Sequence, residues 1–273
     1  MSQSVSPPPS PQRTRTNGMT RFVTLRTVFA LILREMTTTY GRSPGGYVWA
    51  IIQPVAIIAL LAAVFSYALR APSLGTSFLL FYATGILPLR LFQDLSGSIG
   101  GAIQANRALM SYPRVTFVDV ILARAILSVL TQVMVNVVVL AGIFWIDGIR
   151  TSLDFTPILQ AYGICVALAV GVGVLNCYLT FAFPVWKTVW GIVTKPLLLV
   201  SGVFYIFEDV PSAAQQILWF NPLIHITGLA RQGFYGAYHP GYINLLFVAS
   251  FAIVPLFFGV LLLSRFNKDA LFK

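Results

Sequence analysis

Six long runs of apolar residues limit what this chain can fold into more than any other feature of its sequence. They cover residues 47–69, 78–98, 117–146, 157–182, 190–207 and 242–264. Each run is close to or above the roughly 20 residues that a helix needs to cross a bilayer, and the fifth is the shortest. Only 10% of all residues are charged, whereas a soluble domain has about 25%. The sequence therefore predicts an all-α integral membrane protein with six transmembrane helices.

The basic residues predict how these spans are oriented. If both termini lie in the cytoplasm, most of the 18 lysines and arginines fall in cytoplasmic segments, and only Arg70, Arg150 and Arg231 fall outside. The positive-inside rule favours this arrangement, and an even number of spans agrees with it. Topology thus explains most of the net charge of +10. A basic route for an anionic solute is an additional hypothesis, while no motif for binding nucleic acid is present.

The part of the chain before the first span has two sections. Residues 1–19 are rich in Ser, Pro and Gln and are predicted to form a disordered cytoplasmic tail. Residues 20–39 have apolar side chains on one face of a helix, with Arg21, Arg26 and Arg34 near the borders of that face. Such an amphipathic helix suits the headgroup layer of an anionic membrane surface. The alternative is a helix that packs on others within a bundle.

Small residues recur every four positions in the fourth apolar run. One stripe consists of Cys165, Ala169, Gly173 and Cys177, and a neighbouring stripe contains Ala167 and Gly171. Stripes of this kind let helix backbones approach closely within lipid. The two cysteines are too far apart along a helix for a disulfide, so we interpret them as structural. Pro196 and Pro255 are predicted to kink the fifth and sixth spans.

Two short helical patterns lie between the fifth and sixth spans. Ser212 and Asn221 stand where N-caps are expected, and Pro222 suits a first helical position. Each helix is too short to cross a membrane, so residues 212–235 are predicted to lie at the outer face or to dip into it as a re-entrant pair. A gate at the outer mouth of a pathway is the functional interpretation. An ordinary extracellular loop is equally compatible with the sequence.

The loop between the second and third spans is the other polar stretch of interest. Residues 100–113 are too polar to be buried in lipid, and they predict a short cytoplasmic helix that ends at Pro113. Short cytoplasmic helices of this kind are places where a partner protein can press on a membrane domain.

The sequence offers little that could support catalysis. Its eight acidic residues are scattered, and they have no metal-ligand spacing with its two histidines. There is no G-x-x-x-x-G-K-[ST] phosphate-binding loop and no nucleophile elbow. We therefore expect no catalytic residue and no metal or other cofactor on this chain.

Several short motifs together resemble one known family. They are Arg34-Glu35, Tyr40-Gly41, Gly46-Tyr47-Val48-Trp49-Ala50 and Gln53-Pro54 near the start, and Gly171 to Asn176, Phe183-Pro184-Val185-Trp186-Lys187, Pro196-Leu197, Ser201-Gly202-Val203-Phe204-Tyr205, Asn221-Pro222-Leu223-Ile224-His225 and Arg231-Gln232-Gly233-Phe234-Tyr235 further on. The combination resembles the ABC-2-type permeases that export capsular polysaccharides from Gram-negative bacteria, the polysialic acid or group 2 capsule exporters. In one departure, Thr227-Gly228 stand where that family often has an acidic residue after the histidine.

The resemblance implies a homodimer in the inner membrane, with a channel at its centre and both termini in the cytoplasm. ATP and magnesium would bind to a dimer of a separate cytoplasmic ABC ATPase, so this chain would be a permease subunit and not an enzyme. Residues 20–39 would form the interface helix at a lateral opening, 100–113 the coupling helix that contacts the ATPase, and 212–235 the periplasmic gate helices. The cargo would be a lipid-linked capsular polysaccharide, passed on to a periplasmic co-polymerase and an outer-membrane polysaccharide exporter.

Three groups of residues are candidates for these roles. The substrate channel and its entrance are assigned to Arg34, Tyr40, Arg42, Tyr47, Trp49, Arg90 and Lys195. The ATPase contact is assigned to Arg107, Leu109, Tyr112 and Arg114. The periplasmic gate is assigned to Trp219, Asn221, Pro222, His225 and Arg231.

Some channel candidates have a competing structural interpretation. Sugar rings stack on aromatic faces, but Tyr47 and Trp49 are also suited to the aromatic belt of a membrane protein. Arg90 is an ionisable residue within a span, which indicates function by default. A pair with Asp94, one turn later, would instead make it structural.

Two other functions are compatible with the same sequence. An ABC-2 exporter of a different substrate, such as lipid-linked O-antigen or teichoic acid, would share the fold. A non-transport membrane scaffold for polymer synthesis would share the apolar spans but would form no complex with an ATPase.

Overall fold

The computed structural model describes residues 20–39, 45–110, 115–148 and 153–272, and every regular element in these ranges is a helix. The all-α prediction is therefore confirmed for the described part of the chain. Residues 1–19, predicted to be a tail, lie outside the described residues.

The helices follow one another from the N-terminal to the C-terminal end of the described chain. They are α1 (Thr20–Thr39), α2 (Gly46–Ala68), α3 (Phe78–Gly100), α4 (Ala102–Ala105), α5 (Arg107–Met110), α6 (Phe117–Asp147), α7 (Phe155–Ala182), α8 (Trp186–Thr194), α9 (Leu197–Val200), a 3-10 turn (Phe207–Asp209), α10 (Ser212–Leu218), α11 (Pro222–Phe234) and α12 (Leu245–Phe272). Among the described residues, five helices are long and apolar enough to cross a membrane, namely α2, α3, α6, α7 and the Leu245–Arg265 part of α12.

The predicted fifth span, residues 190–207, is not a single helix. The chain there is divided into α8 and α9, and the break lies at Lys195 and Pro196. Proline has no amide hydrogen to donate to the preceding turn, and its ring clashes with that turn, so a break at Pro196 is expected. Pro255 has a milder effect, because α12 continues through it.

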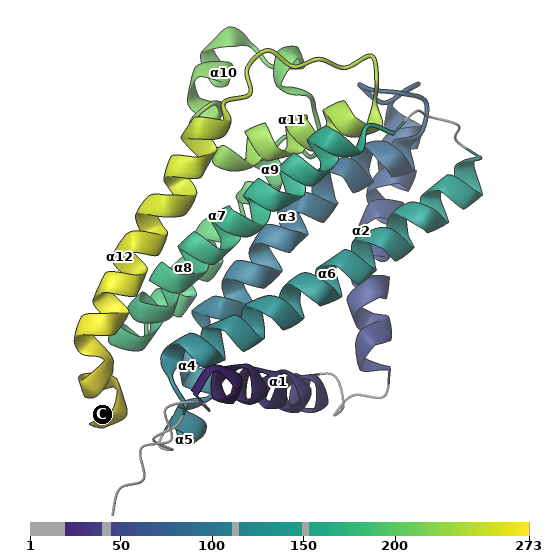
Figure 1. Cartoon of the computed structure of the whole chain (residues 1–273). Coiled ribbons are helices and arrows are strands. Elements are labelled where there is room, and N and C mark those ends of the chain that lie inside the picture. The colour runs from purple at the N-terminus through teal and green to yellow at the C-terminus, as the bar shows by residue number, and fades with distance from the viewer. Residues whose placement is uncertain (1–19, 40–44, 111–114, 149–152, 273) are drawn as a thin grey trace, which may run out of the picture.

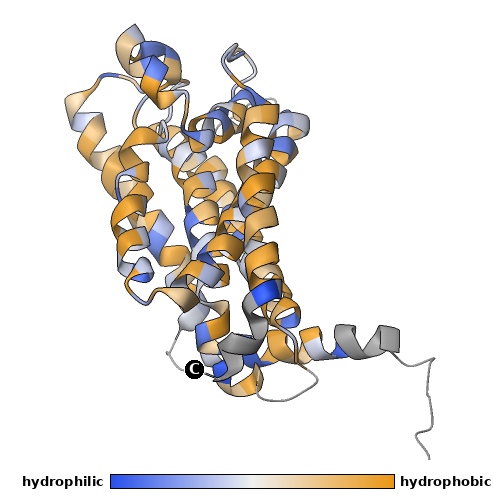
Figure 2. Ribbon diagram, turned by 90° about the vertical axis from the view of Figure 1, so that its left-hand side faces the viewer, coloured by the Kyte–Doolittle hydropathy of each residue, from blue (hydrophilic) through white to orange (hydrophobic). Residues whose placement is uncertain are grey.

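The long helices run side by side, and the shorter ones lie at their two ends (Figure 1). Helix α1 lies across the lower ends of the long helices, next to α4, α5 and the C-terminus, and we call this the α1 end. Helices α10 and α11 lie at the opposite end, which we call the α11 end. Figure 2 shows that apolar residues dominate the long helices between these ends, as a bilayer requires.

Helix α3 is the centre of the fold, although it is the least apolar of the five long helices. In its span-forming stretch 72% of the residues are buried, against 17% in α2 and in α12. It packs against α2, α6, α7 and α11. Burial by protein is what allows a helix that carries ionisable residues to lie within a membrane.

Helix α7 packs closely against helices on two sides because of its small residues. A Cβ atom on Gly171 would lie 2.0 Å from the carbonyl oxygen of Ala252 on α12. A Cβ atom on Gly173 would lie 2.9 Å from the Cβ of Ile99 on α3. Cys165 and Cys177, on the same stripe as Gly173, are buried free thiols. The predicted close packing at these small residues is confirmed.

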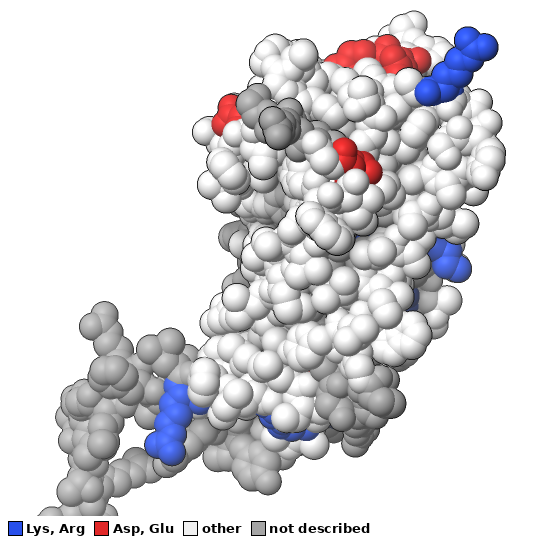
Figure 3. Space-filling view, turned by 90° about the vertical axis from the view of Figure 1, so that its right-hand side faces the viewer, with Lys and Arg blue, Asp and Glu red and all other residues white. Residues whose placement is uncertain are grey.

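Several acidic residues gather at the α11 end, and several arginines lie at the α1 end. Asp147 ends α6, the carboxylate of Asp154 accepts a hydrogen bond from the amide of Thr156 at the start of α7, and Glu208 and Asp209 lie in the 3-10 turn. Figure 3 shows the acidic atoms at this α11 end. The arginines of α1 and α5 lie at the α1 end. The positive-inside rule concerns the arginines, since acidic residues contribute little to orientation.

The packing of α7 on α12 can be tested with Gly171→Ala. The added methyl group would meet the backbone of Ala252, so the two helices must separate. We expect a loss of about 1–3 kcal/mol of stability, measured as a lower thermal unfolding midpoint in detergent. Gly163→Ala on the same helix is the control, because a Cβ atom there meets open space. Equal midpoints for the two variants would contradict the close contact.

Candidate functional site

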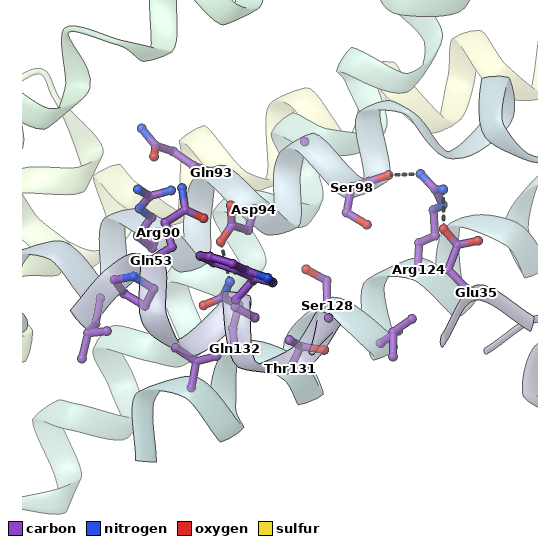
Figure 4. Close-up of a pocket in the computed structure, with 18 residues that line it drawn as sticks. Glu35, Gln53, Arg90, Gln93, Asp94, Ser98, Arg124, Ser128, Thr131 and Gln132 are labelled. Carbon is purple, nitrogen blue, oxygen red and sulfur yellow. Dashed lines mark hydrogen bonds and ion pairs between the residues drawn. The ribbon is translucent and has the colours of Figure 1, made fainter. Parts of the chain in front are cut away.

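A polar cavity of about 750 Å³ lies between α1, α2, α3 and α6 (Figure 4). Its polar lining consists of Glu35, Gln53, Arg90, Gln93, Asp94, Ser98, Arg124, Ser128, Thr131 and Gln132. Trp49 and Pro54 of α2 add apolar surface to its wall. A cavity of this size and composition in an apolar helix bundle is suited to a hydrophilic ligand.

Helical spacing explains why these polar residues meet. On α3, Arg90, Gln93, Asp94 and Gly97 are three to four residues apart and therefore share one face. On α6, residues 124, 128, 131, 132 and 135 repeat the same spacing and also line the cavity. The two faces meet across the cavity, while the opposite face of α3 packs on α7.

Within the described residues, the guanidinium of Arg90 has neither a hydrogen bond nor an ion pair. The carboxylate of Asp94 instead accepts a hydrogen bond from Nε2 of Gln132, at 2.5 Å. Arg90 and Asp94 form no direct ion pair, but both line the cavity and the charge of Arg90 acts on the Asp94 carboxylate. The predicted partnership is therefore electrostatic and leaves the hydrogen-bond donors of Arg90 open to a ligand.

The other end of the cavity is lined by a charge pair between α1 and α6. Glu35 and Arg124 form an ion pair, and Nη1 of Arg124 also donates to the carbonyl oxygen of Ser98 at 3.0 Å. Figure 4 shows this pair at the opposite end of the cavity from Arg90 and Gln53.

The channel candidates from the sequence are only partly brought together. Trp49 and Arg90 line the polar cavity. Lys195 lines a smaller cavity of about 310 Å³ that shares Gln93 and Gly97 with the first. Tyr47 is half-buried near the start of α2 and does not line the polar cavity.

Arg34 also lies outside the polar cavity, and its Nη1 donates to Oδ1 of Asn106 at 3.0 Å. Tyr40 and Arg42 lie outside the described residues.

Sequence reasoning missed the glutamines, Thr131 and Arg124 as parts of a cavity. The sequence does contain a pattern that indicates these residues, because they are polar and recur every three or four positions within apolar runs. This pattern does not show which helix faces meet.

Two short helices occupy the segment predicted as one coupling helix, 100–113. These are α4 and α5, which meet at the buried Asn106. Arg107 is exposed on α5 and Leu109 is half-buried. Tyr112 and Arg114 lie outside the described residues.

The start of α11 follows the predicted capping pattern. Oδ1 of Asn221 accepts from the amide of Leu223 at 3.0 Å, and Pro222 is the first residue of the helix. Nδ2 of Asn221 donates to the carbonyl oxygen of Val200 at 3.0 Å, which ties α11 to α9. The predicted N-cap at Ser212 was wrong. Pro211 precedes α10, and Ser212 is its first residue, without a capping hydrogen bond.

His225 ties α11 to both of its neighbours. Its side chain is fully buried, its Nε2 lies 2.8 Å from the carbonyl oxygen of Trp219, and its Nδ1 accepts from the amide of Asn244 at 3.3 Å. Because a carbonyl can only accept, Nε2 carries the proton and the ring is neutral. Burial lowers the pKa of His225, which keeps it neutral.

Arg231 is the most deeply buried charged residue among those described. Its Nη1 donates to the carbonyl oxygen of Tyr205 at 2.7 Å, and its Nη2 donates to that of Val203 at 3.1 Å. Its guanidinium carbon lies 4.2 Å from the centre of the Phe81 ring on α3. Burial lowers its pKa. The residue therefore fastens the turn after α9 between α11 and α3.

Thr227 and Gly228, where the resemblance leads one to expect an acid, are tightly packed. The hydroxyl of Thr227 donates to the carbonyl oxygen of Ser201 at 2.8 Å. A Cβ atom on Gly228 would lie 2.1 Å from the hydroxyl oxygen of Tyr242. A carboxylate at Gly228 would displace the Tyr242 ring.

Comparison with known proteins identifies the family. Residues 26–235 match the ABC-2 type transporter family. The chain is 33% identical to the polysialic acid transport protein KpsM of Escherichia coli over 90% of its own length and 95% of the relative's. This chain is a member of the ABC-2 transporter family.

Two further relatives bear out the predicted resemblance to capsule export permeases. This ABC-2 chain is 28% identical to the capsule polysaccharide export inner-membrane protein CtrC of Neisseria meningitidis. It is 29% identical to the corresponding protein BexB of Haemophilus influenzae. Each alignment covers 89% of this chain and 92% of the relative. Together with its five long apolar helices, these relatives indicate a multi-pass inner-membrane protein.

The buried, neutral His225 predicts a dependence of stability on pH. The unfolded chain takes up a proton near pH 6.5, whereas the folded chain does so only at lower pH. Stability should therefore be constant above this pH and should fall below it, by at most about 1.4 kcal/mol per pH unit. The thermal midpoint between pH 7.5 and 5.5 in detergent measures this.

His225→Gln should flatten that pH dependence, whatever its effect on stability at pH 7.5. His239→Gln is the matched control, because His239 is exposed and is the other histidine of the chain. An unchanged slope in His225→Gln would show that a different group titrates.

Proposed function

We propose that this chain is the permease subunit of an ATP-driven exporter that moves capsular polysaccharide, on a lipid terminus, from the cytoplasm to the periplasm. The observation that carries the proposal is a polar cavity within an apolar bundle, lined by Arg90, whose guanidinium has no hydrogen bond among the described residues. The relatives KpsM, CtrC and BexB, whose names refer to polysialic acid or capsule polysaccharide transport, support the nature of the cargo.

The cavity has the chemical groups that a sugar polymer needs. The amides of Gln53, Gln93 and Gln132 can donate and accept hydrogen bonds with hydroxyl groups. Trp49 offers an aromatic face on which a sugar ring can stack. Arg90 adds a positive charge for a carboxylate or phosphate of an acidic polymer.

The chain works as one half of a homodimer in this proposal. A long polymer needs a route across the whole membrane, which is larger than the cavity of one chain. Helix α8 has no buried residue, and α2 is among the least buried long helices. A second copy that covers these helices would complete a channel next to the polar cavity.

The short helices α8 and α9 together form the fifth of six membrane crossings. Helix α7 ends at the α1 end, and α10 lies at the α11 end (Figure 1). The chain must therefore return across the bilayer through α8 and α9. Their shortness is tolerated where they line protein or water and not lipid.

The α1 end faces the cytoplasm, as the arginines of α1 and α5 suggest. An ABC ATPase dimer docks there on α4 and α5, with Arg107 and Leu109 as contacts. The chain has no phosphate-binding loop, so ATP and magnesium bind to that partner. Helices α10 and α11 form the periplasmic gate, which faces the periplasmic co-polymerase and the outer-membrane exporter.

Deletion of the gene in its capsule-forming host tests the proposed function. We expect full-length polymer to accumulate inside the cells, as shown by cell fractionation and polymer-specific staining. Absence of polymer everywhere would instead favour a scaffold for synthesis. An unchanged surface capsule would exclude the capsule as cargo and favour another ABC-2 substrate, such as lipid-linked O-antigen or teichoic acid.

Arg90→Gln tests the role of the cavity. We expect export in the complemented deletion strain to fall about tenfold, since a hydrogen bond to a charged group contributes roughly 1.5–3 kcal/mol. Arg26→Gln is the matched control, because Arg26 is exposed on α1 and does not line the cavity. Equal surface polymer in the two strains would exclude Arg90 from the substrate route.

A further inference from the structure

Two consecutive residues of α1 connect this helix to two different parts of the molecule. Arg34 contacts the junction of α4 and α5, and Glu35 contacts Arg124 at the end of the polar cavity. Consecutive side chains on a helix point about 100° apart, so one turn of α1 can make both contacts at once.

The contact of Arg34 is well defined on both sides. Its Nη1 donates to Oδ1 of Asn106 at 3.0 Å. Asn106 is buried, and its Nδ2 donates to the carbonyl oxygen of Ala102 at 3.1 Å. This second hydrogen bond fixes the orientation of the amide, so its oxygen faces Arg34. A movement of the α4–α5 junction will therefore displace Arg34 and with it α1.

The contact of Glu35 lies at the α1 end of the cavity. Both Glu35 and Arg124 line the cavity, and their side chains are only 14% and 15% exposed. Arg124 also donates to the carbonyl oxygen of Ser98, near the end of α3. Its Nε atom, however, is buried without an acceptor among the described residues. Arg124 therefore does not make all of its possible hydrogen bonds in this structure. This lowers the free-energy cost of breaking its ion pair with Glu35.

We propose that Arg34 and Glu35 form a two-sided link that transmits movement of α4 and α5 to the Glu35–Arg124 pair. This pair acts as a latch at the α1 end of the cavity. The proposal rests on the proposed function, because it takes the ATPase to press on α4 and α5. It assigns a role to Glu35, Asn106 and Arg124, none of which belongs to the predicted channel or ATPase-contact groups.

A static anchor for α1 would make the same contacts, so the test must separate transmission from folding. The measurement is the amount of polymer moved per ATP hydrolysed by the purified complex of permease and ATPase in proteoliposomes. A weaker fold lowers the amount of complex, and with it both activities. A broken link lowers the ratio, while the complex still forms and hydrolyses ATP.

Glu35→Arg and Arg124→Glu are each expected to lower this ratio about tenfold, within the range of ordinary coupling energies. The double variant restores the pair with reversed charges and should recover most of the ratio. The milder variants Glu35→Gln and Arg34→Gln should lower it in the same direction. Arg26→Gln, on the same helix, should not change it.

The link is overturned if the single charge variants move polymer per ATP as well as the wild type does, or if the double variant is no better than they are. Failure of the proposed function has a different signature, since the wild-type complex would then move no polymer at all. Arg107→Glu provides a contrast, because loss of the docking contact should reduce binding of the ATPase itself.

Discussion

The arrangement depends on one constraint, which is that α3 carries charged and polar residues through the middle of a membrane protein. Such a helix is stable only where protein or water covers it. On one side the small residues of α7 bring that helix close enough to exclude other atoms, as Gly173 does against Ile99. On the other side α2 and α6 stay further away and present polar side chains of their own. Helix α7 covers one side of α3 with protein, and water can cover the other side. That second side, which faces α2 and α6, forms the cavity.

The sequence predicted the elements better than it predicted their partners. Long apolar runs identified α2, α3, α6, α7 and α12, because bilayer thickness sets their length whatever their neighbours are. The capping of α11 by Asn221 was also predictable, since it involves only local backbone groups. The cavity was not, because Gln132 and Asp94 meet only once the rotation of two helices is fixed by their packing. The break at Pro196 shows a related limit, since an apolar composition does not require a continuous helix.

Local chemistry also explains why the segment from α9 to the start of α12 is held so firmly. The end of α9 and the turn that follows it leave backbone carbonyl groups without amide partners, and these groups need donors. Asn221 satisfies the carbonyl of Val200, Thr227 that of Ser201, and Arg231 those of Val203 and Tyr205. The donors come from the cap, the middle and the last turn of α11. Helix α11 is therefore held in place by the carbonyl groups at the end of α9 and in the turn after it.

Arg231 and Arg90 look alike in the sequence, because each is a single cation near apolar residues. The structure gives them different hydrogen-bond partners. Arg231 lies beside the turn after α9, where two backbone carbonyl groups accept its hydrogen bonds and the Phe81 ring faces its charge. Arg90 lies on α3 and faces α2 and α6, and most carbonyl groups of these helices accept hydrogen bonds within the helix. The carbonyl groups one turn before Pro54 and Pro88 are exceptions, because proline has no amide hydrogen to donate. The nearest acid on its own helix face, Asp94, is bonded to Gln132. Arg90 has no hydrogen-bond acceptor among the described residues, so water or a ligand can supply one. Arg124, the other arginine that lines the cavity, is held by Glu35. Arg90 is therefore the arginine of the cavity that a negatively charged ligand can use.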